Sequence, residues 1–255
     1  MTDLLKQLAE EKFGINANPD DIEKLKSYIL KTHTTVNREI LDKVFLSGEA
    51  AGFLTVGETY FFREPAHFSF LMELLPEYEN KITRICSAAV ASGCEAYSIA
   101  MLIESYNKRA KKPVLYHIDA FDINPAVIET AAKGGAYSVH SLREDGSCFR
   151  YMSDPFLEKT SSGYQVDGSL RKNIRFFVHN LMDDLPFGVY DFLFFRNAFI
   201  YFSHRKREKV LSNLHSALKE GGILFMGVSE TAGVHYPGLE DKNQNDVFYF
   251  RKTVL

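Results

Sequence analysis

Ile82-Thr-Arg-Ile-Cys-Ser87-Ala-Ala-Val-Ala-Ser-Gly93-Cys-Glu95 is the stretch of sequence that decides the fold. A run of strand-forming residues leads into a turn of small side chains, and an amphipathic segment follows. Small residues let the backbone approach a ligand closely, Gly93 can adopt a positive φ, and the start of the next helix offers unpaired N–H groups. The stretch indicates a ligand-binding turn between a strand and a helix, although an ordinary tight turn has the same composition.

Outward from this turn, short β-rich runs alternate with amphipathic helices. This alternation is typical of a parallel sheet covered by helices on both faces, so we predict an α/β fold. The expected strands are Arg84–Ala89, Leu115–Phe121, Ile174–His179, Asp191–Phe195, Ile223–Gly227 and Val247–Arg251. The expected helices are Glu95–Lys108, Pro125–Lys133 and His204–Lys219.

Two regions depart from the alternation. Residues 1 to about 54 have helical apolar spacing, as at Leu25 and Ile29, with Pro19 where a helix would begin. The segment at about 136–172 is rich in Gly, Ser and polar residues and contains short alternating stretches such as Gly163-Tyr-Gln-Val-Asp. We expect an N-terminal helical domain at 1–54, a linker and junction at 55–80, and a sheet domain at 81–255 with an inserted lobe at about 136–172.

Composition excludes several classes of protein. The chain has 255 residues, of which 45% are hydrophobic, so it can bury a core and is neither disordered nor fibrous. Its 30 basic and 33 acidic residues give a net charge of −3, without the basic excess that binds nucleic acid or anionic membranes. Three cysteines without a C-x-x-C pair argue against disulfides and a metal site. No signal peptide or long apolar run is present, so we expect a cytoplasmic protein that does not insert into a membrane.

Polar residues follow two of the expected strands. In an open parallel sheet, ligands bind at the carboxyl ends of the strands where the strand order reverses. Asp122 lies where a carboxylate would contact a nucleotide ribose, although such acids also cap helices. Arg196 and Asn197 follow a strand too apolar to face water, so the charge of Arg196 needs a partner, either at a ligand cleft or in a salt bridge that fixes the loop.

Aromatic residues accompany two further candidates. Arg63 directly follows Tyr-Phe-Phe at the junction of the two domains, where clefts form, although such aromatics also pack in cores. Tyr201 lies in an apolar stretch and has an equally good interpretation as a core residue.

Together these segments resemble the CheR family of chemotaxis receptor methyltransferases, which are protein-glutamate O-methyltransferases. The matching motifs occur in the family order over about residues 55–252. They are Glu58-Thr-Tyr-Phe-Phe-Arg-Glu64, Ser87-Ala-Ala, Ser92-Gly-Cys-Glu-Ala-Tyr-Ser-Ile-Ala100, Asp122-Ile-Asn124, Asn180-Leu181, Phe195-Arg-Asn-Ala-Phe-Ile-Tyr-Phe202 and Gly221-Gly-Ile-Leu-Phe-Met-Gly-Val-Ser-Glu230.

The resemblance implies a Rossmann-like methyltransferase sheet that binds S-adenosylmethionine (SAM) and releases S-adenosylhomocysteine. It implies that Arg63 and Tyr201 face the reacting carboxylate, that the insertion is a small β-subdomain, and that the partner is the cytoplasmic domain of a chemoreceptor. We expect Ser87 and Gly93 of the turn to belong to the cofactor site. The resemblance adds Thr59, Arg63, Glu95, Asp122, Asn180, Leu181, Arg196 and Asn197.

This sequence departs from the family pattern in places. Cys94 and Ala96 replace a Glu and a Pro of the cofactor turn, whereas Glu95 is kept. The family typically has an Arg-rich N-terminal helix that meets the receptor, but residues 1–54 here contain seven basic and nine acidic residues, a net charge of −2.

Three other functions therefore remain open. The chain is alternatively a SAM-dependent methyltransferase of another protein or a small molecule, or a non-catalytic module that binds SAM in signalling. A nicotinamide-dependent oxidoreductase is a more distant alternative, because G-x-G-x-x-G is absent. If the acceptor is a glutamate, its carboxylate is already ionised at neutral pH and needs no general base.

Overall fold

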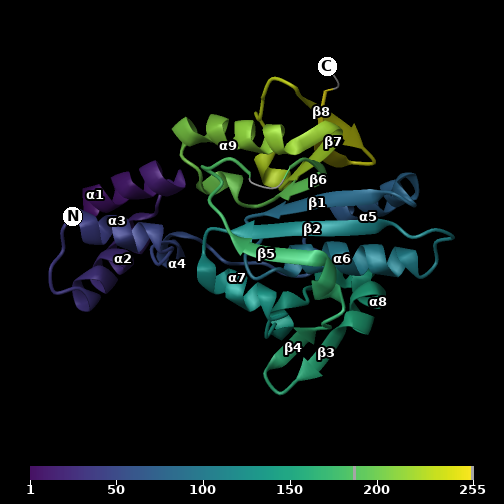
Figure 1. The fold of residues 1–255 in the computed structure, drawn as a ribbon, viewed down its shortest axis with the longest axis horizontal. Coiled ribbons are helices and arrows are strands. Elements are labelled where there is room, and N and C mark those ends of the chain that lie inside the picture. The colour runs from purple at the N-terminus through teal and green to yellow at the C-terminus, as the bar shows by residue number, and fades with distance from the viewer. Residues whose placement is uncertain (186–187, 254–255) are drawn as a thin grey trace.

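The computed structural model describes residues 1–185 and 188–253, and its centre is a seven-stranded sheet (Figure 1). The strand order is β5-β2-β1-β6-β7-β9-β8. The first five of these strands are parallel, and β9 and β8 are antiparallel to their neighbours. Their bounds are β1 Ile82–Ala88, β2 Leu115–Asp122, β5 Ile174–Val178, β6 Tyr190–Phe195, β7 Leu218–Met226, β8 Leu239–Gln244 and β9 Val247–Lys252. The order reverses between β1 and β6, which is where a doubly wound sheet places its ligand.

Helices cover both faces of the sheet. Helices α5 (Pro65–Leu74) and α6 (Cys94–Asn107) contribute Phe68 and Ile99 to a core shared with Ile85 of β1. On the opposite face, α9 (His204–Ala217) packs Leu214 against Leu193 of β6. Helix α7 (Pro125–Ala132) lies beside β5. The α/β class predicted from the sequence is confirmed.

The N-terminal residues form four helices with their own apolar cluster. Asn18 begins the second helix by accepting a hydrogen bond from Asp20 N–H, and Pro19 occupies its first turn, as the sequence predicted. Leu25 and Ile29 of this helix are fully buried. A π-helical turn, Ala9–Phe13, follows the first helix and leads toward the second. The four helices are α1 Thr2–Leu8, α2 Pro19–Thr32, α3 Arg38–Leu46 and α4 Ala51–Leu54.

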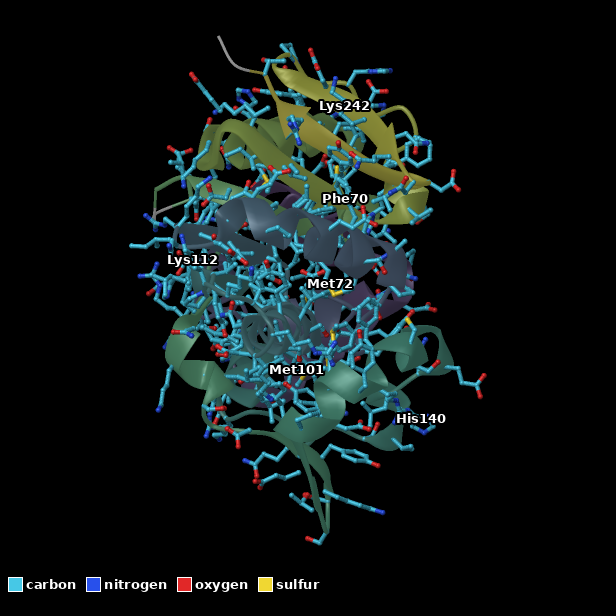
Figure 2. The ribbon with its side chains drawn as sticks, turned by 90° about the vertical axis from the view of Figure 1, so that its right-hand side faces the viewer. Phe70, Met72, Met101, Lys112, His140 and Lys242 are labelled. Carbon is cyan, nitrogen blue, oxygen red and sulfur yellow. The ribbon has the colours of Figure 1, made fainter. Side chains whose placement is uncertain are left out.

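The segment between α7 and β5 leaves the sheet and forms a lobe at its edge (Figure 1). It contains the short helix α8 (Arg150–Ser153) and a hairpin of β3 (Leu157–Thr160) and β4 (Gly163–Val166). Figure 2 shows Phe70, Met72 and Met101 between this lobe, marked by His140, and the β8–β9 end, marked by Lys242. The division of the chain into domains stays a prediction.

Several elements were not expected from the sequence, among them strand β8 and helix α5. Strand β8 carries charged residues, including Glu240, Asp241 and Lys242, and is exposed on both faces at the edge of the sheet, so it lacks the apolar alternation that marks a strand. Helix α5 falls within residues 55–80, where a linker and junction were expected, and it is short and apolar around much of its surface. Within residues 1–185 and 188–253, no helix combines the length and apolar character needed to cross a membrane.

Candidate active site

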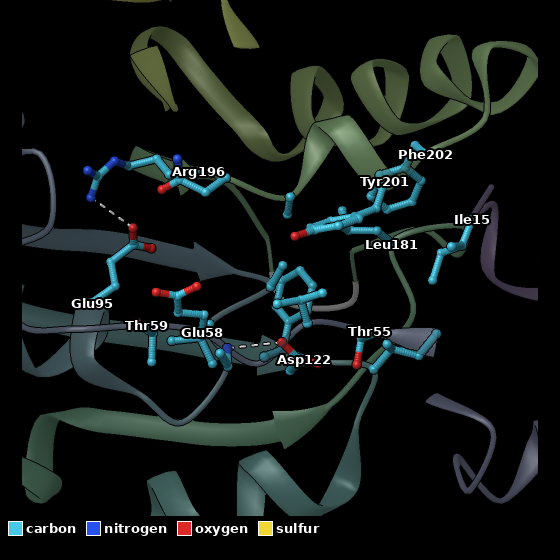
Figure 3. A pocket seen from close by; sticks show the side chains of 18 of the residues that line it. Ile15, Thr55, Glu58, Thr59, Glu95, Asp122, Leu181, Arg196, Tyr201 and Phe202 are labelled. Carbon is cyan, nitrogen blue, oxygen red and sulfur yellow. Dashed lines mark hydrogen bonds and ion pairs between the residues drawn. The ribbon is translucent and has the colours of Figure 1, made fainter. Parts of the chain in front are cut away.

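A cavity opens at the carboxyl ends of β1, β2 and β6, where the strand order reverses. It encloses about 960 Å3 of empty space, including its open mouth. Figure 3 shows Glu95, Asp122, Arg196 and Tyr201 around it. The sequence-predicted residues that line it are Thr59, Arg63, Glu95, Asp122, Asn180, Leu181, Arg196, Asn197 and Tyr201.

The turn after β1 forms one wall of the cavity. Ala89 and Ala91 have φ values of 57° and 50°, which residues other than glycine rarely adopt. Gly93 has a φ of 94°. Val90 N–H donates to the carbonyl of Phe121 at 2.9 Å, which ties the turn to the end of β2. A Cβ on Gly93 would lie 2.9 Å from the Cβ of Ala131, so the turn and α7 approach closely only because this residue is glycine.

Asp122 lies at the tip of β2 and is held by the backbone. Its two carboxylate oxygens accept hydrogen bonds from Ala91 N–H at 2.9 Å and Asn124 N–H at 3.0 Å. Burial raises the pKa of Asp122, against the effect of these hydrogen bonds. A fixed, buried carboxylate at this position can accept hydrogen bonds from ligand hydroxyl groups.

Arg196 is the centre of a buried ion-pair network. Its guanidinium lies 3.1 Å from Glu95 Oε2 and 3.1 Å from Glu64 Oε2, and it also donates to the carbonyl of Arg63. Burial raises the pKa of Glu95, whereas Arg196 and Asn197 outweigh burial and hold the pKa of Glu64 below its usual range. The sequence left two alternatives for Arg196, a partner at a ligand cleft or a salt bridge that fixes the loop. In the structure Arg196 forms the salt bridge and also lines the cavity.

Asn197 is held in place by two glutamates. Its φ is 58°, its side-chain amide donates to Glu64 Oε1 at 2.9 Å, and its backbone N–H donates to Glu230 Oε2 at 2.6 Å. Glu230 is buried and also accepts the backbone N–H groups of Ile200 and Gly227. The loops that follow β6 and β7 are thereby joined beside the cavity.

The side chains of Arg63 and Tyr201 offer hydrogen-bond donors that no described residue occupies, and Arg63, unlike Arg196, is not neutralised by a carboxylate. Throughout the part of the chain that the structure describes, no carboxylate lies within 4.0 Å of the Arg63 guanidinium, whose one hydrogen bond goes to the carbonyl of Glu58 at 3.3 Å. Among these same residues the Tyr201 hydroxyl has no hydrogen-bond partner. Both side chains line the cavity, so a cation and a hydroxyl donor are available there to an anionic ligand.

The N-terminal helices close the cavity from the opposite side, with Phe13, Ile15 and Leu54 in the lining. Asn16 N–H donates to the carbonyl of Tyr201 at 2.8 Å, and the Asn180 amide donates to the carbonyl of Lys12 at 2.6 Å. The sequence did not predict these lining residues, because apolar residues in the N-terminal segment carry no local sign of a cavity.

Two predicted cofactor residues lie behind the cavity wall and do not line it. Ser87 is fully buried and donates a hydrogen bond to Glu95 Oε1 at 2.7 Å, so it acts on the cavity through Glu95. Gly93 shapes the turn through its positive φ. Further lining residues that were not predicted include Glu58, Tyr60 and His179.

The polar groups of this cavity suit a nucleoside cofactor. His179 lines it beside Phe121, with ring centroids 5.1 Å apart, and its buried Nε2 has no hydrogen-bond partner in the structure. Within residues 1–185 and 188–253, the buried Nε of Arg196 also lacks a partner. With the fixed carboxylate of Asp122 and the aromatic rings in its lining, the cavity suits a ligand that carries an aromatic base, hydroxyl groups and a charged tail.

The sheet order, the antiparallel β9 between β7 and β8, and a carboxylate-lined cavity at the reversal point define a Rossmann-like methyltransferase of the SAM-dependent class. The chain belongs to the CheR methyltransferase family, because the protein-family model described as "CheR methyltransferase, SAM binding domain" matches residues 57–247.

Curated proteins of this kind are similar to most of the chain. A chemotaxis protein methyltransferase of Vibrio parahaemolyticus is 36% identical over 74% of this chain and 68% of its own length. The probable biofilm formation methyltransferase WspC of Pseudomonas aeruginosa is 33% identical over 78% of this chain, and an uncharacterised 104.1 kDa protein of Rhodobacter capsulatus is 32% identical over 87% of it. The alignments with these last two cover only 48% and 22% of their lengths.

Proposed function

We propose that the chain methylates glutamate side-chain carboxylates of a chemoreceptor to methyl esters, using SAM, in chemosensory adaptation. The observation that carries this proposal is the contrast between the two cavity arginines. Arg196 is neutralised by Glu64 and Glu95, whereas Arg63 has no carboxylate partner among the described residues. An unpaired guanidinium in a cofactor cavity is an attractive site for an acceptor carboxylate.

The cofactor-holding residues follow from their positions. We assign Asp122 to the ribose hydroxyls, Glu95 to the ammonium group of the cofactor's amino acid, and Asn180 with Leu181 to the base. Thr59 and Asn197 complete the lining, and Ser87 and Gly93 support it from behind. When bound, SAM supplies a methyl group on a positively charged sulfur, which is already an activated leaving group.

The protein's own task is then to position the acceptor. A glutamate carboxylate is ionised at neutral pH, so no residue has to remove a proton from it. Arg63 would hold this carboxylate and Tyr201 would donate a hydrogen bond that sets its angle. Alignment of two reacting groups contributes up to roughly 7–11 kcal/mol in well-oriented systems.

A different protein acceptor is the second candidate. The net charge of −2 on residues 1–54 does not favour binding to an acidic receptor segment, and the similarity to WspC extends over 78% of the chain.

We also propose that the protein acts in the cytoplasm, on the cytoplasmic domain of its partner, without nucleic acid or membrane insertion. The N-terminal helices (1–54), the junction (55–80) and the sheet with its insertion would be the functional units.

Labelled SAM incubated with the chain and membranes from its own cell tests the proposal. We expect label on large membrane proteins that mild alkali releases as methanol, because carboxyl methyl esters hydrolyse whereas N-methyl products do not. Label on soluble proteins alone would favour the second candidate. Calorimetric binding of SAM without any transfer would instead support a non-catalytic module.

A further inference from the structure

Two guanidinium groups lie on the ring of Tyr60, a residue that lines the cavity. The Cζ atom of Arg63 is 5.4 Å from the ring centroid, and that of Arg143 is 4.4 Å from it. Both distances are within the range of cation–π attraction. Arg143 comes from the inserted lobe, about 80 residues along the chain from Arg63, so this ring joins the lobe to the acceptor side of the cavity.

Glu58 links the same two arginines a second time. Its carboxylate forms an ion pair with Arg143, and its backbone carbonyl accepts the hydrogen bond from Arg63 at 3.3 Å. Figure 3 shows Glu58 among the side chains that line the cavity. The Glu58 carboxylate offsets the charge of Arg143, so the charge of Arg63 stays available to a ligand.

The lobe is firmly attached at this point. Phe61 N–H donates to the carbonyl of Ser141 at 2.9 Å, and the rings of Phe62 and Phe149 stack at 4.8 Å with an angle of 8° between them. Both phenylalanines of this stack are buried. Since these contacts lie on either side of Arg143 in the sequence, its position beside Tyr60 is set by the fold of the lobe.

We propose that Arg143 is a positioning residue for the acceptor step. By holding Tyr60 and Glu58 it fixes the pose in which Arg63 meets the acceptor carboxylate, and it makes acceptor affinity depend on the seating of the inserted lobe. This inference rests on the proposed function, since it takes Arg63 as the group that binds the acceptor.

Kinetics of Arg143→Ala with receptor-bearing membranes and labelled SAM test this role. We expect the membrane concentration for half-maximal rate to rise on the order of fivefold, because the substitution removes the cation–π contact with Tyr60 and the ion pair with Glu58. The Kd for SAM, measured by calorimetry, should stay unchanged. Arg143→Lys should recover much of the loss because it keeps the charge over the ring. Arg109→Ala is the matched control, since Arg109 lies 5.9 Å from the ring of Tyr151 in a similar pair outside the cavity lining.

A double-mutant comparison separates positioning from a general effect on folding. In a Tyr60→Leu background, which lacks the ring, Arg143→Ala should have a smaller further effect, because only its ion pair with Glu58 is left to lose. In a Tyr60→Phe background, which keeps the ring, Arg143→Ala should raise the half-maximal membrane concentration by the full factor. Equal losses in both backgrounds, or an altered Kd for SAM with no change in acceptor dependence, would overturn the proposal. If Arg63→Ala itself transfers methyl groups normally, the proposed function fails; if only Arg63→Ala is impaired and Arg143→Ala matches the wild type, this inference alone fails.

Discussion

At the scale of single residues, the two cavity arginines have different roles: Arg196 holds the loops of the site together, and Arg63 is available to bind the acceptor. Arg196 is almost fully buried and shares its charge with Glu64 and Glu95, so its removal would leave two carboxylates without their cation. Among the described residues, the Arg63 guanidinium has only a carbonyl and an aromatic ring as direct partners. The sequence placed both arginines at a cleft, but it could not assign their partners, because Glu64 and Glu95 reach Arg196 only through the folded chain.

Tyr201→Phe removes the free hydroxyl and keeps the ring in the cavity wall. We expect kcat to fall about 10- to 100-fold, because a hydrogen bond to a charged group contributes about 1.5–3 kcal/mol. The Kd for SAM should change little in calorimetry. A variant with normal kcat would show that the hydroxyl has no part in aligning the acceptor.

His67 makes a prediction about stability and pH. Burial, together with the nearby Arg196, lowers the pKa of His67 from 6.5 to about 4. The unfolded chain therefore takes up a proton between pH 6.5 and about 4 that the folded chain does not, so stability falls as the pH falls through this window. The difference in pKa corresponds to roughly 3 kcal/mol. In urea denaturation at several pH values, the free energy of unfolding of His67→Gln should fall less steeply as the pH is lowered. The free energy of unfolding of His140→Gln, a substitution at an exposed position, should fall as that of the wild type does.

At the scale of elements, the turn from β1 to α6 was predicted closely. Strand-forming residues, small side chains and Gly93 indicated its course, and the strand and helix appear within two residues of their expected bounds. Strand β8 was missed because an edge strand exposed on both faces has no apolar alternation. Local sequence patterns also could not predict that Ser87 lies behind the cavity wall, because its contact with Glu95 depends on the direction in which the helix leaves the turn.

Gly93→Ala tests the packing of this turn. The substitution introduces a Cβ at a positive φ of 94° and within 2.9 Å of the Cβ of Ala131, so we expect about 2–4 kcal/mol of destabilisation in urea. Gly221→Ala is the control, because its φ is also positive, 73°, but no atom lies within 4 Å of the new Cβ. Equal costs for the two variants would mean that the approach of α7 contributes nothing.

At the scale of the whole molecule, the cavity depends on segments far apart in the sequence. The N-terminal helices, the junction, the sheet and the loop after β6 all contribute to its lining. The sequence predicted the sheet and most of its strand-end residues, because alternation and position are local signals. It could not predict that Phe13 and Ile15 line the same cavity, because only the chain's tertiary course brings them to Tyr201.

Cofactor binding should consequently stabilise the whole chain. At a SAM concentration of 100 times the Kd, the free energy of unfolding should rise by about 2.7 kcal/mol, seen as a shift of the calorimetric transition. Asp122→Ala should lose most of the shift, because it removes the fixed carboxylate at the tip of β2. An equal shift in the variant would remove Asp122 from the cofactor site.

The most direct test of the account compares Arg63→Met with the wild type at saturating SAM and counts alkali-labile methyl groups transferred to receptor-bearing membranes. If Arg63 binds the acceptor, the variant still binds SAM but transfers methyl groups at least about tenfold more slowly, because the acceptor carboxylate has lost its cation. Transfer at the wild-type rate by a variant that binds SAM normally would contradict it.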